Sequence, residues 1–161
     1  MMEQGWKEKL NIAKENLVYI DELSDEECEQ RFWKAHGLVD ELIKTKDSEV
    51  LECLLEFFNE ENEEYGGFCE HLKSQIGANF TLDQLLNALY KKFDYLIEND
   101  VSKLVQFSFW FFSSNMFESF RNMFNQIHSV NSEKYLNELD DWSENDYIIE
   151  RKILREDMKK W

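Results

Sequence analysis

Residues 81–96 read TLDQLLNALYKKFDYL, and they carry the strongest helical pattern in the chain. The apolar residues of this stretch fall at spacings of three and four, which places them on one face of an α-helix. They are Leu82, Leu85, Leu86, Leu89, Tyr90, Phe93 and Leu96. Thr81 and Gln84 form a capping box, in which each side chain satisfies a free backbone amide of the first turn. The stretch therefore predicts an amphipathic helix with one face in a core.

The residues before this stretch repeat the pattern in shorter segments. Ser24 and Glu27 form another capping box, and Asp47 or Ser48 can cap the helix that follows it. Gly77 is expected to end a short helix that begins near Gly66. The apolar stripes here comprise Trp6, Leu10, Ala13, Leu17, Ile20, Cys28, Phe32, Ala35, Val39, Leu42, Val50, Leu51, Leu54, Leu55 and Phe58. Four helices are therefore predicted before residue 80.

The residues after the stretch continue as helices to the C-terminus. Asp100 is predicted to cap a helix that ends in FSFWFF at residues 107–112, a run so apolar that it belongs in the centre of the fold. Asn115 and Glu118 are predicted to begin the next helix. Its apolar face comprises Phe117, Phe120, Phe124 and Ile127. Ser132 and Ser143 are predicted caps of two further helices, near residues 133–139 and 144–160.

The composition agrees with a purely helical fold, because the chain has no proline and only five glycines and shows no hairpin signal. We expect an all-α fold, either an irregular antiparallel helical bundle or a short HEAT-like helical solenoid of eight to nine helices. No Pro-, Ser- or Gly-rich linker interrupts the sequence, which predicts a single helical domain over residues 1–161.

The charge and the cysteines indicate where the protein acts. The 34 acidic residues outnumber the 18 basic ones, and a net charge of −16 argues against a nucleic-acid partner. The longest stretch without a formal charge, residues 104–117, is too short to span a bilayer, so no membrane association is expected. Cys28, Cys53 and Cys69 show no Cys-x-x-Cys spacing and are predicted to be reduced core thiols. We expect a cytoplasmic monomer or weak dimer.

Two blocks of the sequence hold much of the acidic excess. Residues 47–72 contain no basic residue, and residues 138–146 place one tryptophan among five carboxylates. Like charges on one helix face repel each other, so binding of a basic protein partner would reduce the repulsion. The alternative interpretation is that these carboxylates simply form a solvated face. The candidate partner-binding residues are Glu52, Glu56, Glu60, Glu61, Glu63, Glu64 and Tyr65 in the first acidic block, and Asp140, Asp141, Trp142, Glu144 and Asp146 in the second.

Some of the same carboxylates fall at spacings found in enzymatic motifs. Asp140-Asp141-x-x-Glu144 resembles the magnesium motif of prenyl-chain enzymes, but a second motif is missing. Glu60-x-x-Glu63 resembles a motif of helical nucleotide pyrophosphohydrolases, but its downstream counterpart is missing. A standard di-iron bundle is excluded because no histidine follows a glutamate at Glu-x-x-His spacing.

Cys69-x-His71 offers two side chains that could bind a metal ion. Structural zinc requires four ligands, and two ligands on one short element do not supply them. Cys69 is therefore expected in the core and His71 at the surface. The sequence accordingly predicts no catalytic residue, no cofactor and no metal ligand.

The segment Glu63-Glu64-Tyr65-Gly66-Gly67-Phe68, following an apolar helix in a small acidic all-helical chain, resembles the helical immunity proteins that bacteria encode beside polymorphic toxins. The resemblance implies a non-enzymatic inhibitor that covers the active surface of a cognate toxin domain, often a basic nuclease. Tyr65, Phe68 and Trp142 would then be aromatic anchors. Two other functions stay open: a phage-type DNA mimic that inhibits a nucleic-acid-binding defence protein, and a small helical metal-dependent hydrolase.

Overall fold

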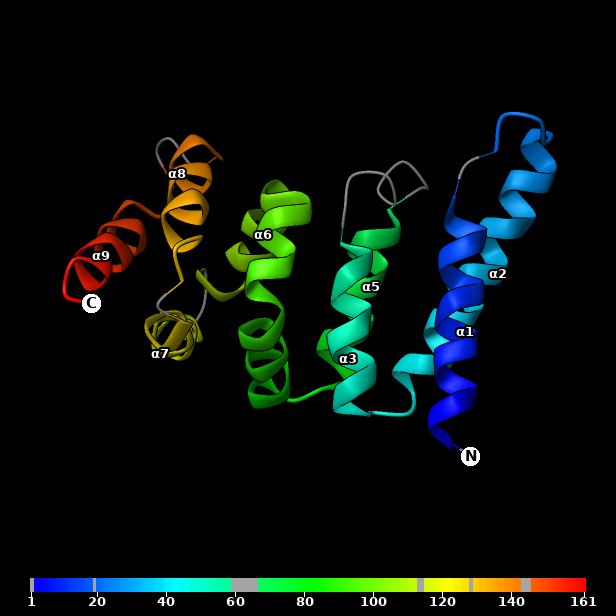
Figure 1. The fold of residues 1–161 in the computed structure, drawn as a ribbon, viewed down its shortest axis with the longest axis horizontal. Helices are drawn as coiled ribbons and strands as arrows, with labels where there is room; N and C mark the ends of the chain where they lie inside the picture. Colours follow the sequence, from blue (N-terminus) through cyan, green and yellow to red (C-terminus); the bar gives the residue numbers. More distant parts are fainter. Residues whose placement is uncertain (1, 19, 59–66, 113–114, 128, 143–145) are drawn as a thin grey trace. The chain divides into compact units, whose positions relative to one another are not determined.

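The computed structural model describes residues 2–18, 20–58, 67–112, 115–127, 129–142 and 146–161, and every regular element within these ranges is a helix (Figure 1). The all-α prediction is therefore confirmed. No helix in the described ranges has the length and apolarity needed to cross a membrane. The elements are α1 (Met2–Leu17), α2 (Asp25–Ile43), α3 (Ser48–Leu54), the 3-10 helix η1 (Leu55–Phe57), α5 (Phe68–Asn79), α6 (Leu82–Phe112), α7 (Phe117–Ile127), α8 (Ser132–Trp142) and α9 (Ile148–Met158).

The chain divides into two compact units, Met1–Thr81 and Leu82–Trp161. The first unit contains α1 to α5, and the second contains α6 to α9. Each unit has its own set of buried apolar side chains. The single domain expected over residues 1–161 stays a prediction.

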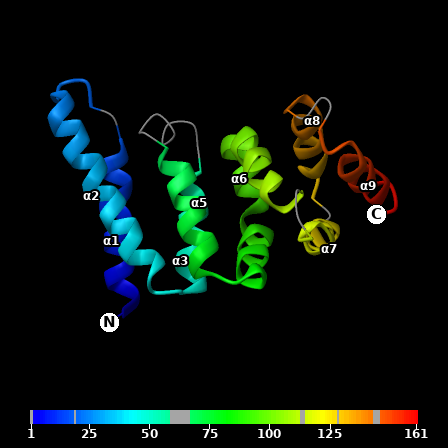
Figure 2. The ribbon, with the colours of Figure 1, turned by 180° about the vertical axis from the view of Figure 1, so that it is seen from behind.

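Helix α2 organises the first unit, because it packs against α1, α3 and α5. Figures 1 and 2 show α1 and α2 side by side as an antiparallel hairpin. The predicted capping box opens α2: the Glu27 amide donates to Ser24 Oγ (3.2 Å), and the Ser24 amide donates to Glu27 Oε2 (2.8 Å). Asp47 caps α3 by accepting from the Glu49 amide at 2.8 Å. Local sequence signals therefore fix both helix starts.

Helix α5 departs from its predicted end. Gly77 was expected to end the helix, but α5 runs on to Asn79, and the Phe80 amide still donates to the Ile76 carbonyl at 3.0 Å. A glycine costs only about 1 kcal/mol inside a helix. Ile76 and Phe80 are buried on either side of Gly77, so packing outweighs this weak preference. The helix starts after Gly67, whose φ of +80° suits glycine better than any other residue.

The cysteines only partly follow their prediction. All three are free thiols, but Cys69 alone is buried, and Cys28 and Cys53 are half-buried. Cys69 Sγ lies 3.8 Å from the Phe57 carbonyl oxygen, to which it donates. The core position expected for Cys69 is confirmed, and the core positions expected for the other two are wrong.

The second unit is built on α6, which breaks at Asp100 (φ −160°, ψ 84°). Asp100 Oδ1 accepts from the Lys103 amide at 3.2 Å, so the predicted cap is present and starts the second half of α6. Ser132 is different: it is the first residue of α8, and within the described part of the chain its buried hydroxyl has no hydrogen-bond partner. The expectation that its side chain caps α8 is therefore wrong. Ser143 lies outside the described residues.

Aromatic side chains fill the core of the second unit. Phe93 from α6 meets Phe124 from α7 and Tyr135 from α8, with ring centroids 6.3 and 5.4 Å apart. The Tyr135 hydroxyl is fully buried and donates to Ser108 Oγ at 2.7 Å. Burial raises the pKa of Tyr135, so the phenol stays neutral. The three helices therefore share one aromatic cluster with its polar group satisfied.

An ion pair between half-exposed Arg121 and buried Asp157 holds α9 against α7. Asp157 is 7% exposed and accepts from Arg121 Nε at 2.7 Å, from Arg121 Nη2 at 2.9 Å and from Asn125 Nδ2 at 2.8 Å. The hydrogen bonds from Arg121 lower the pKa of the Asp157 carboxyl despite its burial. The carboxylate is therefore well satisfied in its charged form.

We expect Phe93→Ala to destabilise the protein by about 3–5 kcal/mol, because it removes a ring that touches two other helices and leaves a cavity. Tyr90→Ala, one turn earlier and 44% exposed, should change the free energy of unfolding by about 0.5 kcal/mol or less. Urea unfolding followed by circular dichroism measures both. Equal effects would show that α6 buries a different face.

We expect the stability that Asp157 contributes to the folded protein to disappear in acid. Its native pKa is lowered, so its stabilisation is complete above the unfolded-state pKa of about 3.9 and is lost as the pH falls through the native pKa. Asp157→Asn should cost about 2 kcal/mol at pH 7, and the difference from wild type should shrink below pH 4. Unfolding midpoints across pH 3–7 test this, with Glu156→Gln as the exposed neighbouring control. A difference that stays constant with pH would contradict the assignment.

Candidate functional site

The described members of the first acidic block are less solvated than the sequence suggests. The Glu56 side chain is 15% exposed and accepts from Lys14 Nζ of α1 at 2.9 Å. Glu52 is half-buried, whereas Glu49 is exposed. Although residues 47–72 contain no basic residue, the fold brings Lys14, 42 positions earlier in the chain, to Glu56. Glu60, Glu61, Glu63, Glu64 and Tyr65 lie outside the described residues.

The second acidic block also meets bases from a later helix. Asp140 accepts from Arg151 Nη1 at 3.2 Å and from Arg155 Nε at 3.0 Å, so it connects α8 to α9. Asp141, Trp142 and Asp146 are exposed, and Glu144 lies outside the described residues. Within this block, Asp140 is therefore paired inside the protein, whereas Asp141, Trp142 and Asp146 face solvent.

Trp142 is held in place although it is 48% exposed. Its indole Nε1 donates to Glu138 Oε1 at 3.0 Å, and the same oxygen accepts from Ser102 of α6. The ring is therefore tied through Glu138 to the body of the second unit. An exposed aromatic side chain with a fixed orientation loses little conformational entropy on binding.

Phe68 cannot be the aromatic anchor that the resemblance implies. It is 1% exposed, and its ring packs between Phe32 of α2 and Phe57 of η1 at centroid distances of 6.2 and 6.1 Å. Because it starts α5 immediately after Gly67, it fastens this helix to α2. Its role is in the core.

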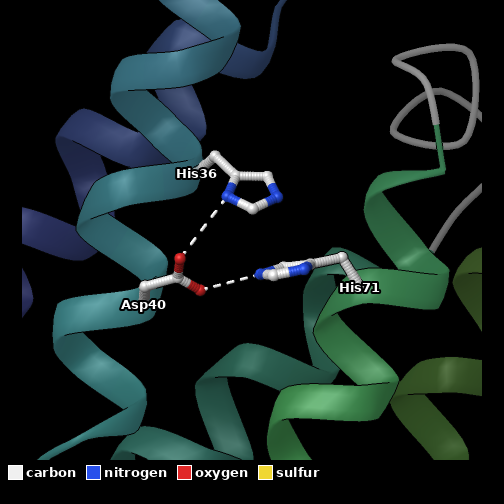
Figure 3. A group of neighbouring side chains, drawn as sticks. All are labelled: His36, Asp40 and His71. Atoms are coloured by element: carbon white, nitrogen blue, oxygen red, sulfur yellow. Dashed lines mark hydrogen bonds and ion pairs between the residues drawn. The ribbon is translucent and has the colours of Figure 1, made fainter.

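A cluster that the sequence analysis missed lies between α2 and α5. Its members are His36, Asp40 and His71, which we call the His–Asp–His cluster (Figure 3). Asp40 Oδ1 lies 3.0 Å from His71 Nε2, and Asp40 Oδ2 lies 3.5 Å from His36 Nδ1. The two imidazole centroids are 3.9 Å apart. The cluster is part of the first unit.

The surroundings of the cluster act on His36. Burial lowers its pKa and the neighbouring His71 lowers it further, while Asp40 opposes both effects. The ring of His36 also lies edge-on to Phe32 and Phe68, with centroids 5.7 and 6.0 Å away. Burial therefore disfavours the charged form of His36, and the two aromatic contacts fix the orientation of its ring.

One sequence signal pointed to this cluster. His36 and Asp40 are four residues apart on a helix, which places both side chains on the same face. His71 could not be assigned to them, because its approach depends on how α5 packs against α2. The pair considered from the sequence, Cys69 and His71, does not form the group: in the described residues, the potential ligands that converge here are His36, Asp40 and His71.

We expect Asp140→Asn to destabilise the protein by about 1–2 kcal/mol, because it weakens the hydrogen bonds from two arginines of α9. Asp141→Asn removes the same charge from an exposed neighbour and should stay within about 0.5 kcal/mol of wild type. Thermal or urea unfolding distinguishes a carboxylate with an internal role from one that is free to meet a partner. The reverse order of effects would contradict the assignment.

Comparison with known proteins adds no functional assignment. The chain matches no protein-family model, no curated protein and no solved structure. Its function must therefore be inferred from its own charges and side-chain geometry.

Proposed function

We propose that this protein is a non-enzymatic binding protein whose partner is a basic protein, and that this partner is a cognate bacterial toxin domain that it neutralises. The observation that carries the proposal is the net charge of −16. An internal ion pair uses one acid and one base together, so pairs such as Lys14–Glu56 leave this excess unchanged. The excess can be neutralised only by counterions or by a positively charged partner.

The exposed end of α8 and the start of α9 offer the best contact surface. We define the α8–α9 acidic surface as Asp141, Trp142 and Asp146, all of which are exposed. It combines two carboxylates with a fixed indole. Such a mixture suits a hot spot, in which an aromatic anchor is buried and surrounding polar groups exclude water.

The two kinds of side chain should act on different rate constants. Exposed charges steer a cationic protein over long distances, so they raise the association rate and are screened by salt. A desolvated tryptophan acts only at contact, so its loss raises the dissociation rate. This difference makes the proposed surface testable with single variants.

The test begins with capture of the partner from the source cells and its identification by mass spectrometry, followed by binding kinetics with the purified pair. We expect Asp141→Lys/Asp146→Lys to slow association about tenfold at low salt, and to do so less at high salt. Trp142→Ala should instead speed dissociation by a factor that changes little with salt. Lysine substitutions at Glu60, Glu61, Glu63 and Glu64 test the first acidic block in the same way.

Matched controls separate a local contact from the total charge. Glu15→Lys/Glu98→Lys changes the net charge as much as Asp141→Lys/Asp146→Lys does, at two exposed positions outside the surface. If the control variant slows association as much as Asp141→Lys/Asp146→Lys does, the net charge of the whole molecule determines the association rate. The α8–α9 acidic surface is then not the contact. If neither acidic block affects binding or the protection of cells that express the toxin, the proposed function is wrong. A captured protein that competes with DNA for the same surface would instead indicate a DNA mimic.

A further inference from the structure

The His–Asp–His cluster has the composition and spacing of a metal site. Two imidazoles and a carboxylate are ligands that transition-metal ions such as Zn²⁺ prefer. His36 and Asp40 lie one helical turn apart on α2, and His71 reaches them from α5 (Figure 3). Ligands from two helices are thus already side by side.

We propose that His36, Asp40 and His71 bind one divalent zinc ion, with water as the fourth ligand. The proposal is independent of the binding function argued above. Three protein ligands with one position left for water is the arrangement of an open zinc site, as distinct from the closed four-ligand structural site. The site therefore predicts an exchangeable ion.

The distances require only small adjustments. One nitrogen or oxygen from each residue lies within 4.8 Å of those from the other two. Tetrahedral zinc with bonds of about 2.0–2.1 Å places its ligand atoms about 3.4 Å apart. Asp40 reaches the two histidines through different oxygens, with Oδ1 3.0 Å from His71 Nε2 and Oδ2 3.5 Å from His36 Nδ1, so the carboxylate must turn to bring one oxygen to this distance from both nitrogens. Rotation of side chains can therefore close the remaining gap while the helices stay in place.

The cluster also suits the entry and retention of an ion. The side chains of Asp40 and His71 are 34% and 35% exposed, so solvent reaches the ligand atoms. The side chain of His36 is 15% exposed and is enclosed by aromatic rings that fix its orientation.

A bound ion would connect α2 to α5 within the first unit. Without an ion, Asp40 of α2 is linked to α5 by the hydrogen bond from His71, and the His36 and His71 rings lie 3.9 Å apart. Anything that binds the folded state alone raises its stability. Zinc should therefore raise the unfolding temperature of the intact chain in proportion to the logarithm of its free concentration.

The experiment is calorimetric titration of the full chain with zinc chloride at pH 7, in a non-chelating reductant. We expect saturable binding of one ion per chain and a rise in unfolding temperature. Asp40→Asn preserves the size of the side chain and its hydrogen-bonding capacity, but it removes the anionic ligand. This variant and His71→Gln should each weaken zinc binding at least about tenfold.

The third histidine of the chain supplies a matched control. His128 lies outside the described residues, so His128→Gln tests whether the third imidazole contributes, and the proposal expects this variant to bind zinc like the wild type. Circular dichroism checks that each variant is folded. His71→Gln is the first choice among the histidine variants, because His36 is more enclosed and its loss also affects packing.

Cobalt distinguishes the cluster from the free cysteines. Co²⁺ in place of zinc should give the visible bands of a four-coordinate site without the near-ultraviolet charge-transfer band of a thiolate ligand. A thiolate band, a stoichiometry that does not saturate at one ion, or unchanged affinity in Asp40→Asn would each overturn the proposal. In that case the cluster is a hydrogen-bonded group only. Failure here leaves the proposed binding function untouched, because that function depends on other residues.

Discussion

Burial of large aromatic side chains between helices is the interaction on which both compact units depend. In the first unit, Phe68 packs between Phe32 and Phe57, and in the second, Phe93 meets Phe124 and Tyr135. A helix hairpin has little stability alone, and each buried ring removes a large apolar area from water. These contacts also fix which side chains face each other across neighbouring helices. The His–Asp–His cluster therefore follows from the aromatic packing of the first unit.

The acidic composition is compatible with this fold because bases distant in sequence meet particular carboxylates. Lys14 reaches Glu56 from α1, and Asp140 meets two arginines of α9. These pairs relieve repulsion at single positions, yet the excess of 16 negative charges remains. The two effects are distinct: local pairing supports the fold, and the uncompensated charge creates the field that favours a basic partner.

The His–Asp–His cluster illustrates how a site arises from packing. Phe68 starts α5 and anchors it against Phe32 on α2, and His71 lies one turn after Phe68. His36 lies one turn after Phe32 in the same way. Packing of the two phenylalanines thus brings the two imidazoles together, next to Asp40. The site needs no sequence motif of its own, because each ligand is carried by a helix that the core has already positioned.

The sequence by itself determined the helices. The apolar spacings and the caps at Ser24, Asp47 and Asp100 act within one or two turns, and the structure has each of these helix starts. The local pattern does not predict the end of α5, because burial of the residues around Gly77 outweighs the preference of glycine for ending a helix. Contacts between distant residues were decided only by tertiary structure, as Phe68 shows by lying in the core. The packing of whole helices brings His71 to Asp40 and Lys14 to Glu56. No local spacing in the sequence encodes these contacts.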